Sequence, residues 1–131
     1  MRALIVICLL ALAGCATSPP SDPVAVPGAR QYAVPPSGPA LLTVTRDAGM
    51  FGALCGVQLY FDGQHVAKLA PSEQISYRVP AGDHIVSADM SAGACNAGMR
   101  ETQIEASADR ATRLRISTGG NGDLSIAPTA F

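Results

Sequence analysis

The sequence contains no tryptophan, and only 15% of its 131 residues are charged. Nine Lys and Arg residues face ten Asp and Glu residues, which gives a formal net charge of −1 at pH 7. Proteins that bind nucleic acid generally carry a basic field, so no nucleic-acid partner is expected. The hydrophobic content of 48% also argues against a disordered chain.

The groups that usually carry catalysis are scarce as well. His65 and His84 are the only histidines, and neither stands in a nucleophile, metal-ligand or phosphate-binding motif. His84 follows Asp83 directly, but neighbouring residues of a strand point to opposite faces, so this pair is poorly placed for acid–base chemistry. We therefore expect no enzyme, no cofactor and no metal site.

The first fourteen residues have the layout of a secretory signal. A basic start is followed by an apolar run over residues 3–13, which is too short to span a bilayer as a permanent helix. The order Leu-Ala-Gly-Cys over residues 12–15 resembles the lipobox of bacterial lipoproteins. An ordinary signal peptide with a chance cysteine at position 15 is the alternative.

The lipobox resemblance implies that Cys15 becomes the first residue of the mature chain, with a thioether-linked diacylglycerol and an acylated amine. Two or three acyl chains make a stable membrane anchor. In that family an Asp after the cysteine typically retains the protein at the inner membrane. Ala16 therefore favours an outer-membrane lipoprotein with its domain in the periplasm.

Seven of the ten prolines lie between residues 19 and 39. Proline fixes φ and removes a backbone donor, so this stretch suits neither a helix nor a central strand. Residues 15–39 are thus predicted to be a lipidated, disordered spacer, whose 24 residues after Cys15 would reach at most about 75 Å. Alternatively, residues 31–34 pack on the domain as an edge segment, because Tyr32 and Val34 are apolar at alternate positions.

Residues 40–131 show short segments of alternating apolar residues at intervals of roughly ten residues. Turn signals such as Asp62-Gly63 separate them. This pattern predicts an all-β fold, a small antiparallel β-sandwich of about seven or eight short strands. The predicted strands are residues 41–46, 57–61, 65–69, 74–79, 84–90, 101–106, 112–118 and 123–127.

The same alternation predicts which side chains form the core. They are Leu42, Val44, Val57, Leu59, Phe61, Val66, Ile75, Tyr77, Val79, Val86, Ala88, Met90, Ile104, Leu114, Ile116, Leu124 and Ile126.

Residues 42–86 carry several short motifs at strand ends and turns. They are Val44-Thr45-Arg46-Asp47, Cys55-Gly56-Val57, Phe61-Asp62-Gly63-Gln64, Lys68-Leu69 and Val79-Pro80-Ala81-Gly82-Asp83-His84. With these motifs the segment resembles a group of small proteobacterial lipoproteins that contain a PEGA-like β-sandwich domain, most of them of unknown function. The resemblance implies the fold and supplies no catalytic motif.

Cys55 and Cys95 are the two thiols that an exported chain would keep besides Cys15, because Cys8 lies in the signal segment. An oxidising periplasm favours a disulfide between them. In a chain-entropy model such a link would stabilise the domain by roughly 4 kcal/mol. Two buried free thiols or a pair of metal ligands are the alternatives.

If successive strands alternate in direction, the loops at residues 47–56, 70–73, 91–100 and 119–122 lie at one end of the sandwich. Both cysteines then share that end. The spacer would join the opposite end, so the cysteine-linked loops would point away from the membrane.

The loops that hold the two cysteines are apolar and rich in glycine. Met50, Phe51, Leu54 and Met99 would form an apolar patch for a partner, or would fold back and plug the end of the sandwich. The expected function is a lipid-anchored, non-catalytic interaction module for an envelope protein or glycan. The alternative is a glycan or small-ligand domain that uses the Cys55/Cys95 loop end, although three Tyr and three Phe offer few stacking platforms.

Overall fold

Every segment that the alternation of apolar residues predicts as a strand is a strand in the structure, a computed structural model that describes residues 17–131. The predicted ends differ from the observed ones by at most two residues. The strands are β2 (Ala40–Arg46), β3 (Val57–Phe61), β4 (Gln64–Leu69), β5 (Glu73–Val79), β6 (Gly82–Asp89), β7 (Met99–Ala106), β8 (Thr112–Thr118) and β9 (Leu124–Pro128). A short strand, β1 (Val24–Ala25), and a single 3₁₀ turn, η1 (Gly28–Arg30), precede them.

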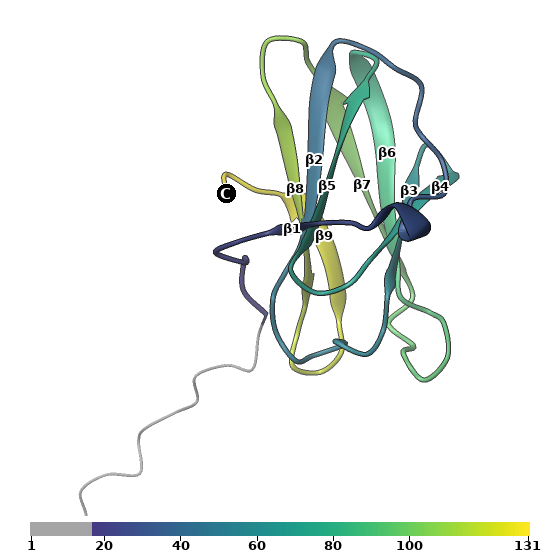
Figure 1. Cartoon of the computed structure of the whole chain (residues 1–131), viewed down its shortest axis with the longest axis vertical. Helices are drawn as coiled ribbons and strands as arrows, with labels where there is room; N and C mark the ends of the chain where they lie inside the picture. Colours follow the sequence, from purple (N-terminus) through teal and green to yellow (C-terminus); the bar gives the residue numbers. More distant parts are fainter. Residues whose placement is uncertain (1–16) are drawn as a thin grey trace, which may run out of the picture.

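The strands form two sheets that pack face to face, which confirms the predicted β-sandwich (Figure 1). One sheet has the order β1-β5-β2-β8-β9, and the other has the order β4-β3-β6-β7. The sandwich is mixed, because β2 pairs with β8 in parallel and so does β1 with β5. Strands that alternate in direction along the chain become parallel neighbours when an odd number of strands separates them, as for β2 and β8.

The hairpin between β3 and β4 forms where Asp62-Gly63 predicted it. Asp62 has φ of 47° and Gly63 has φ of 80°, the left-handed conformations that a two-residue hairpin turn requires.

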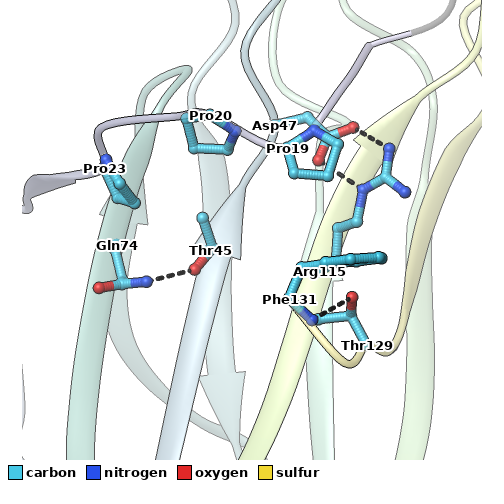
Figure 2. A pocket seen from close by; sticks show the side chains of 9 residues that line it. All are labelled: Pro19, Pro20, Pro23, Thr45, Asp47, Gln74, Arg115, Thr129 and Phe131. Carbon is cyan, nitrogen blue, oxygen red and sulfur yellow. Dashed lines mark hydrogen bonds and ion pairs between the residues drawn. The ribbon is translucent and has the colours of Figure 1, made fainter.

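The proline-rich segment does not form a free spacer over residues 17–39, which we call the strap. It runs along the outside of the sandwich from the edge of the five-stranded sheet to the edge of the four-stranded sheet (Figure 1). In Figure 2, Pro19, Pro20 and Pro23 of the strap lie over side chains of the five-stranded sheet. The spacer prediction is therefore wrong for these residues.

Two features explain why the strap packs despite its prolines. The residues between the prolines keep their backbone groups, so Val24 and Ala25 pair with β5, and the Tyr32 amide donates to the Val66 carbonyl at 2.8 Å. Val26 is buried at 3% exposure and joins the core. The alternative prediction, that this segment packs on the domain at a sheet edge, is correct for residues 31–34, but the packed segment is longer than that prediction.

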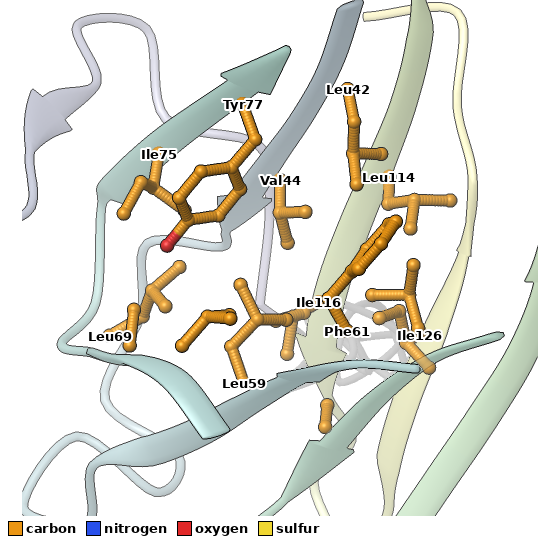
Figure 3. Close-up of a cluster of buried hydrophobic side chains, with 14 of the residues drawn as sticks. Leu42, Val44, Leu59, Phe61, Leu69, Ile75, Tyr77, Leu114, Ile116 and Ile126 are labelled. Carbon is orange, nitrogen blue, oxygen red and sulfur yellow. The ribbon is translucent and has the colours of Figure 1, made fainter. Parts of the chain in front are cut away.

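The core lies between the two sheets. Figure 3 shows side chains of β2, β3 and β8 that point toward one another, including Val44, Leu59 and Ile116. All of the residues predicted to form the core are buried. This follows from the geometry of strands, since every second side chain points to the same face.

Candidate functional site

Three of the four loops that strand parity predicted at one end of the sandwich surround a hollow there. The fourth, at residues 70–73, joins the first loop through a hydrogen bond from the Ser72 amide to the Asp47 carbonyl at 3.2 Å. Cys55 of the first loop and Cys95 of the second form a disulfide, with their Cα atoms 6.1 Å apart. A hollow of about 240 Å³ lies between the loops and is lined by residues of all three, including Gly52, Asn96 and Asn121. We call this end, formed by residues 47–56, 91–99 and 119–122, the loop end.

The predicted patch residues differ in exposure. Met50 is 90% exposed and Leu54 is 102% exposed, whereas Met99 is 44% exposed and Phe51 is half-buried. The alternative that these side chains plug the sandwich is therefore wrong for Met50 and Leu54. The interior below them is filled instead by Met90, which is buried.

Arg46 holds the first loop in place. Its guanidinium donates to the carbonyl oxygens of Gly52 at 2.7 Å and Cys55 at 2.6 Å, and across to Leu69 at 2.8 Å. Burial lowers the pKa of Arg46 to about 10, although the negative charge of Glu73 raises it, so the group stays protonated at neutral pH. The loop that carries Met50 and Leu54 is thus held through its backbone carbonyl groups by the buried Arg46 cation.

The start of the strap is fastened to the same end. The Thr17 hydroxyl donates to Asp47 Oδ2 at 2.8 Å and accepts from the Thr118 amide at 2.9 Å. Arg115 donates from Nε to Asp47 Oδ1 at 2.7 Å and from Nη2 to the Thr17 carbonyl at 3.2 Å. The hydrogen bond to Asp47 raises the pKa of Arg115 despite some burial.

The backbone reinforces this attachment. Ser18 and Ala48 exchange two hydrogen bonds, of 2.9 and 3.1 Å. Gly49 lies so close to the strap that a Cβ on it would come within 2.8 Å of Thr17 Cγ2. The prediction that the N-terminal segment joins the opposite end is therefore wrong, because the strap doubles back along the sandwich before β2 begins.

Farther along the strap, Arg30 of η1 forms a bidentate ion pair with Glu73 of β5, in which Arg30 Nη1 lies 2.7 Å from Glu73 Oε2. The Ala70 amide also donates to Oε2, at 2.7 Å. Burial raises the pKa of Glu73, but the hydrogen bonds from Arg30 and Ala70 and the positive charge of Arg46 outweigh it, so that the pKa is lowered.

A narrow cleft lies between the strap and the C-terminal residues (Figure 2). Three strap prolines and Phe131 supply its apolar walls. Its polar side chains bind one another, since Gln74 donates to Thr45 at 2.7 Å and Arg115 pairs with Asp47. Asp47 and Arg115 also bind Thr17 of the strap, whereas Gln74 and Thr45 join β5 to β2, so these groups are engaged within the fold.

His84 has a partner that sequence reasoning missed. Its Nδ1 lies 2.7 Å from Asp62 Oδ2, and its Nε2 lies 2.7 Å from the Pro80 carbonyl oxygen. Burial lowers the pKa of His84, but these two acceptors and the charge of Asp83 outweigh it and raise the pKa. Because both ring nitrogens face acceptors, neither is available for proton transfer to a substrate.

None of the three tyrosines belongs to the loops of the loop end. The His65 ring stacks on Tyr60, with ring centroids 4.9 Å apart, and lies against Tyr32 of the strap at a tilt of 48°, with centroids 4.6 Å apart. Among the described residues, His65 Nε2 and the Tyr77 hydroxyl are the buried polar side-chain atoms without a partner, and burial raises the pKa of Tyr77 to about 12. A glycan site at the loop end would therefore lack a tyrosine on which a sugar could stack.

Cys15, the predicted lipidation site, lies outside the described residues. Within residues 17–131, no group of three or more His, Cys, Asp or Glu side chains is arranged to hold a metal ion. No helix in this range is long and apolar enough to cross a membrane. Comparison of the chain with protein-family models, with curated proteins and with solved structures finds no match.

Proposed function

We propose that this chain is a lipid-anchored, non-catalytic protein of the cell envelope, whose β-sandwich is an interaction module held directly at the membrane. The lipobox-like residues 12–15 supply the anchor at Cys15, and Ala16 favours the outer membrane, with the domain in the periplasm.

The observation that carries this proposal is the fastening of Thr17 at the loop end. Two peptide units separate Thr17 from Cys15, so their Cα atoms are at most about 7 Å apart. A stalk would let the domain move away from the bilayer. An anchor this close to a fastened residue instead keeps one end of the sandwich at the lipid surface.

The side-chain chemistry of the described residues supports a binding role. The ion pairs Arg30–Glu73, Asp62–His84 and Asp47–Arg115 each join different segments of the chain. Their polar atoms serve the fold, and a catalytic group must instead be free to reach a substrate.

Metabolic labelling with radioactive palmitate tests the anchor. We expect label on the wild-type protein and none on Cys15→Ala, and mass spectrometry of the N-terminal peptide should find the diacylglycerol on Cys15. A Cys55→Ser/Cys95→Ser variant is the matched control, because it retains the lipobox and should be labelled. An unlabelled wild-type chain would disprove the anchor.

A glycan or small polar ligand in the hollow of the loop end is the second candidate. The observation that favours it is the set of polar side chains around the hollow, from Asn96, Thr118 and Asn121. Binding of envelope oligosaccharides by the soluble Cys15→Ala protein, lost in Asn96→Ala, would support this role. Equal binding by both proteins would count against it.

A further inference from the structure

The loop end carries no charge on its outer loops. Residues 48–55, 91–99 and 119–122 contain no Asp, Glu, Lys, Arg or His, although the whole chain has nine basic and ten acidic residues. A protein end that faces water is usually rich in such side chains. These loops instead consist mostly of glycine, alanine and larger apolar residues.

Two large apolar side chains project from this neutral surface. Met50 and Leu54 are almost completely exposed, and Met99 is partly exposed. Arg46 and the Cys55–Cys95 disulfide hold the loop that presents the first two. The loop therefore holds these side chains in an exposed position. Because their exposure to water is unfavourable, burying them against an apolar surface would be favourable.

The anchor and these side chains lie at the same end. Gly49, which contacts Thr17, immediately precedes Met50. Ala48 pairs with Ser18 through two backbone hydrogen bonds. Acyl chains on Cys15, two residues before Thr17, would enter the bilayer beside the loop.

We propose that the loop end is a second membrane contact, in which Met50 and Leu54 lie at the boundary between lipid headgroups and acyl chains. This proposal rests on the proposed anchor at Cys15. The occupant is a lipid bilayer and not a protein, because the fastened strap brings the loops to the lipid surface. Residues 48–55, which present Met50 and Leu54, contain no Lys or Arg, so their contact with the bilayer is apolar and needs no anionic lipid.

One consequence is the orientation of the domain. With the loop end on the bilayer, the turns at the other end, at residues 62–63 and 80–81, face away from the membrane. A protein partner would then meet that distal end, and not the patch of Met50, Phe51, Leu54 and Met99.

The lack of tryptophan makes a direct test simple, since one introduced indole is the sole tryptophan of the chain. Leu54→Trp places it at the loop end, and Ala81→Trp places it on an exposed distal turn as the matched control. Both full-length proteins are purified from cells with the Cys15 lipid verified by mass, and are reconstituted in phosphatidylcholine vesicles with or without brominated acyl chains.

We expect the Leu54→Trp emission to shift to shorter wavelength and to be quenched by the brominated lipid, with no effect of added salt or anionic lipid. Ala81→Trp should show neither change. Lipidated Leu54→Trp protein that behaves like Ala81→Trp would overturn the membrane contact and leave the anchor standing. A missing lipid mass would overturn both proposals.

Two further outcomes would assign the loops to another occupant and overturn the proposal. A blue shift of soluble Cys15→Ala/Leu54→Trp protein that grows with protein concentration would indicate contact between two copies. Capture of an envelope protein, and not lipid, by a photo-crosslinker at Phe51 would indicate a protein partner.

Discussion

At the scale of single residues, several charged side chains of this small domain join separate segments of the chain. Asp62 shows this in its contacts, because it accepts from the Ile85 amide at 2.8 Å and from His84 at 2.7 Å. Arg46 binds three carbonyl oxygens from different parts of the chain. Removing these hydrogen bonds and ion pairs should therefore lower the stability of the fold and the order of the loops.

The first prediction concerns pH. The folded pKa of His84 is raised above 6.5, so its contribution to stability is full below about pH 6.5 and is lost as the pH rises through the folded pKa. The pKa of Asp62 is lowered from 3.8, so the stability that its carboxylate contributes is lost only as the pH falls below 3.8. Because Asp62 is half-exposed, we expect a change of less than about 1 kcal/mol.

Urea unfolding between pH 5 and 9 measures this effect. The wild type should lose stability relative to His84→Gln as the pH rises above about 6.5. Asp62→Asn should reduce the dependence on pH. Parallel profiles for the wild type and His84→Gln would refute the role of the pair.

The second prediction concerns Arg46→Met. The change removes three hydrogen bonds from buried or half-buried carbonyl groups, so we expect a loss of roughly 3 kcal/mol of unfolding free energy. Amide exchange at Ala53 and Cys55, which donate within the loop, should accelerate more than exchange in β8. Arg78→Met is the control, since the single hydrogen bond of Arg78 is exposed. Equal effects of the two changes would contradict the role given to Arg46.

At the scale of elements, the strap is the part that alters the functional interpretation. Proline limits a segment to extended conformations, but it leaves carbonyl groups and the neighbouring amides free to pair. The strap uses them along two sheet edges, at β5 and at Ala67 of β4. By covering edge strands it also protects them from pairing with another chain.

The third prediction tests how the strap is held. Arg30→Met removes the ion pair with Glu73 and leaves a buried carboxylate, at a cost of roughly 1–3 kcal/mol. Hydrogen exchange should accelerate at the amides of Val24, Val26 and Tyr32, while the core of β2 stays protected. Arg113→Met is the control, because the Arg113 side chain is exposed and forms no ion pair within residues 17–131. An unchanged exchange rate along the strap would show that Arg30 does not hold it.

At the scale of the whole molecule, Thr17, the first described residue of the strap, lies at the same end as the exposed side chains of Met50 and Leu54. The distal end carries the Asp62–His84 pair and the polar turns. The two ends lie at opposite ends of the long axis of the sandwich (Figure 1) and differ in chemistry, so the proposed anchor at Cys15 would orient the domain with its loop end on the membrane.

The fourth prediction follows from that geometry. An insertion of about twelve Gly and Ser residues between Ala16 and Thr17 lets the domain move by tens of ångströms from its anchor. In the Leu54→Trp protein it should reduce quenching by brominated lipid, because loop contact would then depend on two apolar side chains alone. The same insertion in the Ala81→Trp protein should change nothing. Quenching that survives the insertion undiminished would show that the short connection is irrelevant.

The alternation of inward and outward residues carries a signal for two site residues that the sequence-based prediction did not include. Arg46 continues the inward face of Leu42 and Val44, and Glu73 continues that of Ile75 and Tyr77. A charged residue on an inward face indicates a buried ion pair or hydrogen bond, because an unpaired charge is costly to bury. Thr17 and Arg115 carried no such signal, since their partners lie far away in the sequence.

The sequence by itself determined the β-strands, the core and the hairpin at Asp62-Gly63, because these depend on a two-residue period and on local backbone conformation. The cysteine pairing was predicted from the expected export and from strand parity, with free thiols and metal ligands as alternatives, and the structure joins Cys55 to Cys95. Only the tertiary structure decided the path of the strap. Its contacts join Thr17 to Asp47 and to Thr118, which are 30 and 101 residues away, and no local pattern encodes such distant partners. That path places Thr17, two residues after the proposed anchor site, at the loop end, and not at the end that strand parity predicted for the N-terminal segment.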